Sequence, residues 1–126
     1  MSTESERRLV WLGSSYKDLL ALPSEVRRFF GFALALAQAG DRHESTKVLK
    51  GFGGGTVLEI IENDLHGTYR AVYTVRHLEA VFVLHCFQKK SRQGISTPRD
   101  DVDLVIKRLK LADELAKEWR HEASTS

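Results

Sequence analysis

The chain has 126 residues, 42% apolar and 29% charged, which is enough for one folded domain (1–126, core about 8–119) with a buried core. Its formal net charge of +2 is too small for a binder that acts through a long basic tail. The N-terminus is polar and no apolar run could cross a bilayer, so we expect neither secretion nor a membrane contact. The single cysteine, Cys86, cannot form an internal disulfide, and a cytoplasmic location fits it.

The first half of the chain predicts one strand and two helices. Residues 8–12 are typical of a short strand, and 16–20 of a short helix for which Ser15 is the better N-cap candidate. A longer helix follows Ser24 and ends at Gly40. Its core-facing stripe recurs every three or four residues, at Val26, Phe29, Phe30, Ala33, Leu34 and Ala37.

The middle of the chain predicts a three-stranded antiparallel meander. Residues 41–50 are polar, and the glycine-rich run 51–55 is interpreted as a flexible connector. The strands are expected at 56–62, 68–76 and 80–88. The last of them is nearly all apolar, as a central strand would be, and Cys86 is expected to pack there as a small buried side chain.

A final helix is predicted after Thr97, which can cap it, with Pro98 at the first helical position and Asp100 and Asp101 at its positive end. Its apolar face would carry Val102, Val105, Ile106, Leu109, Ala112, Ala116 and Trp119. The order β-α-α-β-β-β-α predicts an α+β fold, in which helices pack on an antiparallel-rich sheet and leave its other face, or a concave rim, for binding.

Positive charge gathers in the middle of the chain. Residues 42–99 hold nine lysines and arginines against five acids, and no acid lies between Glu79 and Asp100. The candidate residues are Lys47, Lys50, Arg70, Arg76, Lys89, Lys90 and Arg92. A phosphate backbone is the polyanion that such a site would bind, with Arg70 and Arg76 on one solvent-facing side of their strand. The alternative is that these are ordinary surface charges paired with Glu59, Glu62 and Glu79.

Other chemistry is less well supported by the sequence. His85 lies in the apolar strand, where it is either an acid–base group or, more simply, a hydrogen-bonded core histidine. No histidine or cysteine spacing matches a zinc site and no carboxylates cluster, so we expect no metal and no cofactor. The glycine run lacks the lysine of a phosphate-binding P-loop. Phosphodiester chemistry would then have to proceed without bound metal.

Five segments in order carry a family resemblance. They are Lys47-Val48-Leu49-Lys50-Gly51, Glu59 to Glu62, Gly67-Thr68-Tyr69-Arg70-Ala71-Val72-Tyr73, Phe87-Gln88-Lys89-Lys90-Ser91 and Thr97-Pro98. Together the chain resembles the phage-derived, HigB-like branch of the RelE toxin superfamily from about Leu9 to Leu111. The resemblance implies a RelE-like fold and a toxin of a type II toxin–antitoxin pair, an mRNA endonuclease that inhibits translation at the ribosome.

The resemblance also implies a partner and a site. The partner would be a small HigA-like helix-turn-helix antitoxin, through which alone the toxin would reach operator DNA. The resemblance implies catalytic roles for Lys50, Arg70, Lys89 and Lys90, and RNA-binding roles for Lys47, Arg92 and His85. The charge pattern adds Arg76 as an RNA-binding candidate. Such a site would use the 2′-hydroxyl of the RNA as nucleophile, lysines of lowered pKa for proton transfer, and Arg70 to hold the phosphate.

Two departures from the family pattern leave alternatives open. The arginine that often follows the strand glutamate is replaced, since the chain reads Glu59-Ile60-Ile61, and the C-terminal tyrosine of some RelE enzymes is missing. One alternative is a catalytically degenerate binding protein that keeps the fold. The other is a gyrase poison like those of the ParE branch.

Overall fold

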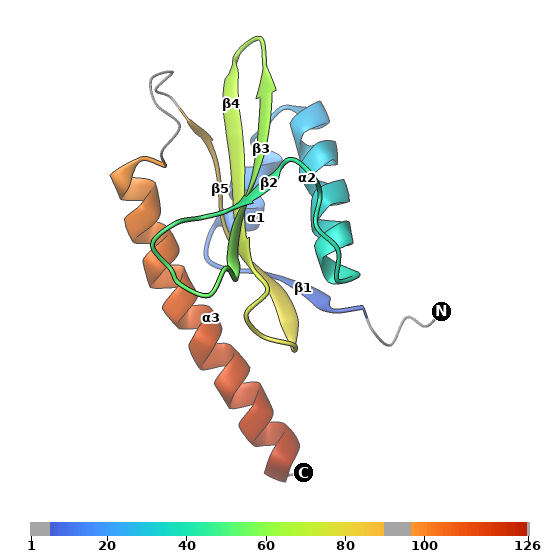
Figure 1. Ribbon diagram of the computed structural model, residues 1–126, viewed down its shortest axis with the longest axis vertical. Coiled ribbons are helices and arrows are strands. Elements are labelled where there is room, and N and C mark those ends of the chain that lie inside the picture. The colour runs from blue at the N-terminus through green and yellow to red at the C-terminus, as the bar shows by residue number, and fades with distance from the viewer. Residues whose placement is uncertain (1–5, 90–96, 126) are drawn as a thin grey trace.

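The computed structural model describes residues 6–89 and 97–125, which form a mixed sheet flanked by helices (Figure 1). The elements are β1 (Arg8–Trp11), α1 (Ser15–Leu20), α2 (Ser24–Gln38), β2 (Thr46–Val48), β3 (Val57–Asp64), β4 (Gly67–Thr74), β5 (Ala80–Lys89) and α3 (Arg99–Thr125). The predicted strands and helices are all present, close to their expected bounds. The α+β class is confirmed.

The sheet has the order β1-β5-β4-β3-β2 and is not purely antiparallel. β2 to β5 pair antiparallel, but β1 pairs parallel with β5, with Arg8 opposite Ala80. β5 therefore lies inside the sheet, as its apolar sequence predicted. β2 was not expected, because its three residues are too few to show a strand period and it exists by pairing with β3.

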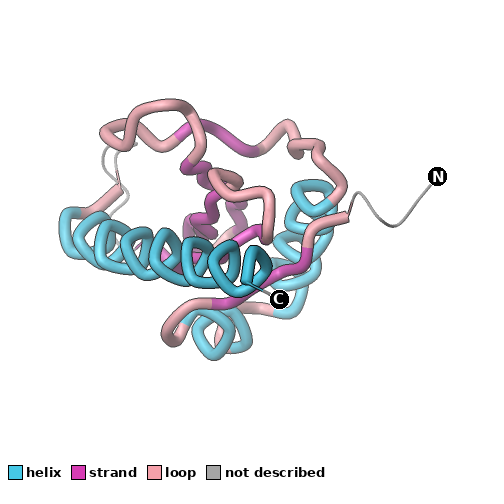
Figure 2. The backbone as a smooth tube through the Cα atoms, turned by 90° about the horizontal axis from the view of Figure 1, so that it is seen from below, coloured by secondary structure: helices cyan, strands magenta, loops and turns pink. Residues whose placement is uncertain are grey.

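Helices cover both faces of the sheet, as the view in Figure 2 shows. α1 and α2 pack on one face, and α3 packs on the other. The expectation that one face would stay open for binding is therefore wrong. The physical reason lies in β4 and β5, whose residues are buried on both sides: Ala71 and Val72 have no exposed surface, although they point to opposite faces.

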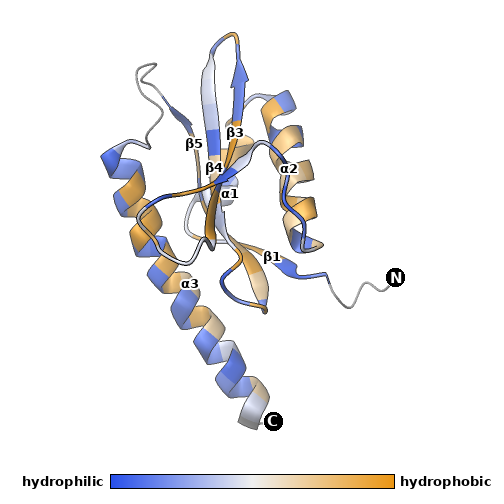
Figure 3. Cartoon of the chain, in the orientation of Figure 1, coloured by the Kyte–Doolittle hydropathy of each residue, from blue (hydrophilic) through white to orange (hydrophobic). Residues whose placement is uncertain are grey.

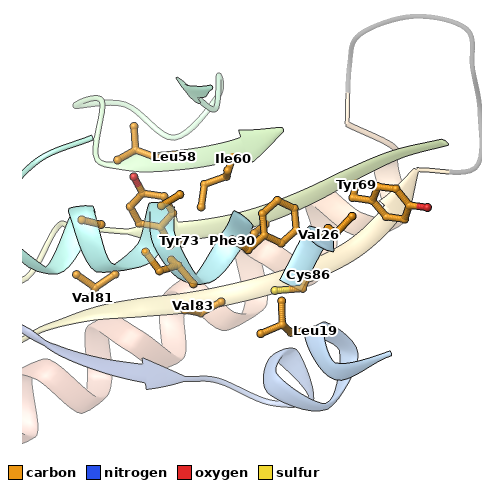
Figure 4. Close-up of a cluster of buried hydrophobic side chains, with 14 residues drawn as sticks. Leu19, Val26, Phe30, Leu58, Ile60, Tyr69, Tyr73, Val81, Val83 and Cys86 are labelled. Atoms are coloured by element: carbon orange, nitrogen blue, oxygen red, sulfur yellow. The ribbon is translucent and has the colours of Figure 1, made fainter. Parts of the chain in front are cut away.

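The first core lies between the sheet and α2 (Figure 4). Phe30 and Leu34 of α2 are fully buried against Ile60 and Tyr73. Each such side chain contributes roughly 1.5–3 kcal/mol by leaving water. Cys86 belongs to this core with 1% of its surface exposed, which confirms it as a small buried side chain. Burial raises the pKa of its thiol to about 12.

The second core lies under α3. Val105, Leu109 and Ala112 pack against Val72 and Phe82 of the sheet. Apolar and polar residues alternate along α3, while the end of β3 next to the β3–β4 turn is hydrophilic and the neighbouring end of β4 is intermediate (Figure 3). The predicted apolar face of α3 is confirmed except at Ile106, which is 41% exposed.

The helix ends differ from the sequence prediction at two caps. Gly40 ends α2 as predicted, with a positive φ of 88° that a side chain rarely adopts. Ser15 does not cap α1, because it is buried and its hydroxyl donates to the carbonyl of Val83 at 3.3 Å. Thr97 does not cap α3 either, because α3 begins at Arg99 and the Thr97 hydroxyl donates to Glu59 at 2.9 Å. Both hydroxyls instead tie a helix to the sheet.

Candidate functional site

Four charged side chains from four neighbouring strands share one sheet face. They are Lys47 of β2, Glu59 of β3, Arg70 of β4 and Lys89 of β5, here called the basic cluster. Cross-strand pairing puts them together, since Lys47 lies opposite Glu59, and Arg70 and Lys89 follow diagonally across β4 and β5. This is the face that α3 covers further along the sheet.

Glu59 is the centre of the basic cluster. It has no exposed surface, and its Oε1 accepts a hydrogen bond of 3.1 Å from Nη1 of Arg70, which is 4% exposed. The Lys47 ammonium lies 3.9 Å from the same oxygen, with its side chain 42% exposed. Because a buried carboxylate needs partners, this arrangement holds Arg70 in a defined position while Lys47 reaches the solvent.

Lys89 lies within the electrostatic reach of these groups. It is 6% exposed, and burial lowers the pKa of its ammonium below the ordinary value of 10.5. The positive charges of Arg70 and Lys47 lower this pKa further, while Glu59 raises it. A lysine of lowered pKa can exchange a proton more readily near neutral pH, which general acid–base chemistry requires.

Thr97 closes the cluster from the side of α3. Its hydroxyl donates to Oε2 of Glu59 at 2.9 Å, two residues before α3 begins. Glu59 is therefore bonded on both oxygens, by Arg70 and by Thr97. Glu59 thus connects β4 to the residues just before α3.

Of the other predicted cations, only some belong to the described part of the chain. Lys50 follows β2 and is exposed, three residues beyond Lys47. Lys90 and Arg92 lie outside the described residues. The glycine run between β2 and β3 turns the chain with positive φ values, 70° at Gly53 and 69° at Gly54. It is followed by a strand, so its interpretation as a connector fits.

Arg76 is not brought to the basic cluster. It lies six residues of extended chain from Arg70, or roughly 20 Å. Its guanidinium contacts Asp113 of α3 at 2.9 Å, and His77 donates from Nε2 to the other oxygen of Asp113 at 2.6 Å. The side of β4 expected to face solvent is also buried, since Val72 and Thr74 have no exposed surface. That expectation was wrong because α3 packs there.

His85 sits where a core histidine would. Its side chain is 8% exposed, and Nε2 donates to Asp101 at 2.7 Å. Its ring stacks on Phe87 with centroids 4.6 Å apart. Nδ1 is buried with no hydrogen-bond partner in the described part of the chain. The geometry fits the hydrogen-bonded core histidine better than a group that reaches RNA.

Two properties of the described residues bear on other kinds of site. None of the helices there is long and apolar enough to cross a membrane. In the same residues, no three histidine, cysteine, aspartate or glutamate side chains gather in a way that could hold a metal ion.

With this geometry in hand, the comparisons place the chain in a family. The family model described as "Phage derived protein Gp49-like (DUF891)" matches residues 17–110, about three quarters of the chain. The chain belongs to the Gp49-like family. This family is known in toxin–antitoxin systems. No curated protein matches the chain.

The Gp49-like match includes the whole basic cluster and Thr97. Sequence reasoning found the cations of the cluster but treated Glu59 only as a landmark or a neutralising partner, and Thr97 only as a cap. One signal was available: Glu59 stands between apolar neighbours in a strand, where a charged residue is buried only if it is paired. Nothing in the local sequence named Thr97 as its partner.

Proposed function

We propose that this protein is the toxin of a type II toxin–antitoxin pair and that it cuts messenger RNA on the ribosome without a bound metal. Its membership of a family known in toxin–antitoxin systems supports the first part. The basic cluster supports the second, because it offers fixed positive charge beside a lysine of lowered pKa. The partner would be a HigA-like helix-turn-helix antitoxin, in the cytoplasm.

In the proposed reaction the 2′-hydroxyl of the RNA attacks the neighbouring phosphorus. The attacking oxygen must lose a proton, the leaving 5′-oxygen must gain one, and the phosphorane-like transition state needs positive charge beside it. Lys89 is the group best suited to move a proton, since burial and nearby cations lower its pKa. Arg70 stays charged and would bind the phosphate oxygens, while the more exposed Lys47 would guide the strand.

Glu59 has a positioning role in this proposal. It bonds the Arg70 guanidinium on one side and Thr97 on the other. By holding Arg70 before RNA arrives, it reduces the entropy lost when the phosphate binds. Lys50, Lys90 and Arg92 remain proposed contacts for RNA, whereas Arg76, which contacts Asp113, and His85, which contacts Asp101, lie outside the proposed site.

The observation that carries the proposal is the convergence of Arg70 and Lys89 around Glu59. The test is a Lys89→Met variant, which keeps an unbranched side chain only one atom shorter and removes its proton chemistry. We expect messenger cleavage after induction in bacteria to fall at least about a hundredfold, the usual contribution of a general acid or base. Cleavage is measured by mapping new RNA ends, and folding by circular dichroism.

The matched control is Lys107→Met, because Lys107 is an exposed lysine of α3 outside the cluster. This variant should cleave like the wild type. Full cleavage by a folded Lys89→Met variant would overturn the assignment of the site. DNA-damage signalling with intact messenger RNA would point instead to a gyrase poison.

A second candidate function is a binding protein that keeps the fold without cutting. One observation favours it: Ile61 lies directly opposite Arg70 on β3, at the position where the related toxins often have an arginine. The site therefore has one cation fewer than the family pattern implies. Normal growth on induction, with stable binding to the product of the neighbouring gene, would support this function.

A further inference from the structure

Two cations of the basic cluster are closed to solvent. Arg70 is 4% exposed and Lys89 is 6% exposed, whereas the side chain of the neighbouring Lys47 is 42% exposed. A guanidinium binds a phosphate oxygen at hydrogen-bond distance, about 2.7–2.9 Å. RNA therefore reaches Arg70 only after part of the protein has moved.

Residues 97–101, here called the strap, cross β4 on the face of the basic cluster. One cross-strand row of the sheet consists of Glu59, Val72 and His85, on β3, β4 and β5. The strap is attached at both ends of this row, since Thr97 donates to Glu59 at 2.9 Å and Asp101 accepts from Nε2 of His85 at 2.7 Å. Neighbouring strands lie about 4.8 Å apart, so the strap spans roughly 10 Å of the sheet.

The Arg70 guanidinium lies against the strap. Arg70 is two residues from Val72 along β4, in the next row, and its side chain reaches back to the row that the strap crosses. Its Nη1 donates to Oε1 of Glu59 at 3.1 Å, and the Thr97 hydroxyl donates to Oε2 of the same carboxylate. The group that a phosphate must reach is thus next to one attachment of the strap.

Polar contacts hold the strap more than burial does. None of its residues is buried, since Arg99 and Asp100 are exposed and the other three are half-buried. The following turns of α3 are held instead by Val105 and Leu109, which belong to the second core. A segment with few buried apolar contacts opens at a small cost in free energy while the rest stays folded. The strap can therefore open without loss of α3.

We propose that the strap closes the basic cluster in the free protein, and that its opening, with loss of the hydrogen bond between Thr97 and Glu59, admits an RNA phosphate to Arg70. This inference rests on the proposed function, because it concerns the regulation of that same site. When only a small fraction of the molecules is open, the apparent Kd for RNA equals the intrinsic Kd divided by that fraction. The strap thus weakens the binding of RNA by the free protein.

The first experiment measures access to Arg70 in the absence of RNA. Thr97→Val removes the hydroxyl and nearly keeps the volume of the side chain, and Thr97→Ser is the matched control that keeps the hydroxyl. One hydrogen bond to a charged group changes an equilibrium constant by about tenfold or more. We expect the arginine reagent phenylglyoxal to modify Arg70 about tenfold faster in Thr97→Val than in the wild type or Thr97→Ser, measured by mass spectrometry. The exposed Arg28 should react at the same rate in all three proteins.

A second pair of variants tests the other attachment and keeps the experiment decisive if Thr97→Val does not fold. Asp101→Ala removes the contact with His85, and Asp100→Ala removes the same charge from an exposed position of the first turn of α3. Modification of Arg70 should be faster in Asp101→Ala and unchanged in Asp100→Ala. Circular dichroism establishes that each variant is folded.

The last experiment measures affinity for RNA by fluorescence anisotropy. The probe is a single-stranded 2′-O-methyl RNA oligonucleotide, which has no free 2′-hydroxyl and is therefore not cut. We expect the apparent Kd of Thr97→Val to be about tenfold lower than that of the wild type, and that of Thr97→Ser to be unchanged.

Equal modification of Arg70 in the wild type, Thr97→Val and Asp101→Ala would overturn the inference. So would an affinity of Thr97→Val for the oligonucleotide that is equal to or weaker than that of the wild type. The proposed function is judged separately, by messenger cleavage in the wild type. A wild type that cuts messenger RNA, with variants that match it in both measurements, would reject the strap alone.

Discussion

Glu59 shows how one buried acid organises the cations around it. Two positively charged residues, Arg70 and Lys89, are almost completely buried, which is costly unless opposite charge is present. Glu59 forms an ion pair with Arg70. It also raises the pKa of Lys89, whereas burial, Arg70 and Lys47 lower this pKa. The Glu59 carboxylate lies near both Arg70 and Lys47, and the burial of Lys89 lowers the pKa of its ammonium. The burial of Lys89 is therefore expected to lower the stability of the fold.

The pH dependence of stability tests this cost. The pKa of Lys89 is lowered in the folded state, so between that pKa and 10.5 the unfolded chain binds more protons. The free energy of unfolding of the wild type should therefore rise with pH across this window, relative to Lys89→Met, which has no titrating group there. Wild type should be least stable relative to the variant at neutral pH, measured by urea denaturation at each pH. A difference that stays constant with pH would contradict a lowered pKa for Lys89.

At the scale of elements, polar contacts join α3 to the sheet at two places along the helix. Just before it begins, Thr97 binds Glu59 in the basic cluster. Further along, Asp113 accepts hydrogen bonds from Arg76 and His77, which follow β4. These contacts prevent α3 from sliding along the sheet, and the apolar face of the helix packs against the sheet in addition. Arg70 lies at the contact between Thr97 and Glu59, and Arg76 lies at the contact with Asp113. These two contacts lie far apart along α3, so the two arginines are separated as well.

A double-mutant cycle can separate attachment from RNA binding at Arg76. Arg76→Gln and Asp113→Asn should each lower the free energy of unfolding slightly, with a coupling of about 0.5 kcal/mol because both partners are partly exposed. Messenger cleavage should stay unchanged in both variants. Loss of cleavage in Arg76→Gln, with normal cleavage in Asp113→Asn, would show instead that Arg76 contacts RNA.

Considered as a whole, the molecule has two cores that share one sheet. The same strands β3, β4 and β5 supply side chains to the core under α2 and to the core under α3. Loss of either helix layer would expose the buried side of these strands. The two cores are therefore expected to unfold together.

The two tryptophans can test this cooperativity. Trp11 packs against the core under α2, and Trp119 packs against the core under α3. In single-tryptophan variants, Trp11→Phe and Trp119→Phe, fluorescence reports one core at a time. We expect coincident denaturation transitions after correction for the stability of each variant, as two-state unfolding requires. Separate midpoints that circular dichroism also resolves would show two independent units.

The helices and strands could be predicted from the sequence, but the strand pairing and the side-chain contacts between strands could not. Strong periodicity marked α2 and α3, and the apolar run of β5 marked a central strand. The three residues of β2 carry no period of their own. Likewise, the burial of Arg70 depends on Glu59, eleven residues away, and on the α3 layer. The cations of the site could be predicted because charge is visible locally, whereas pairing across strands is not.

The parallel pair formed by β1 and β5 has a consequence for the timing of synthesis. β1 cannot pair until β5 has been synthesised, since the partner of Arg8 is Ala80, which the ribosome adds 72 residues later. At ordinary elongation rates of 5–20 residues per second this delay is roughly 4–14 s. Lys89 is added later still, so the basic cluster is not complete on a nascent chain that stops short of Lys89, and its Glu59 lacks the Thr97 partner until residue 97 is added. Under the proposed function, the toxin would leave its own message intact until most of it has been translated.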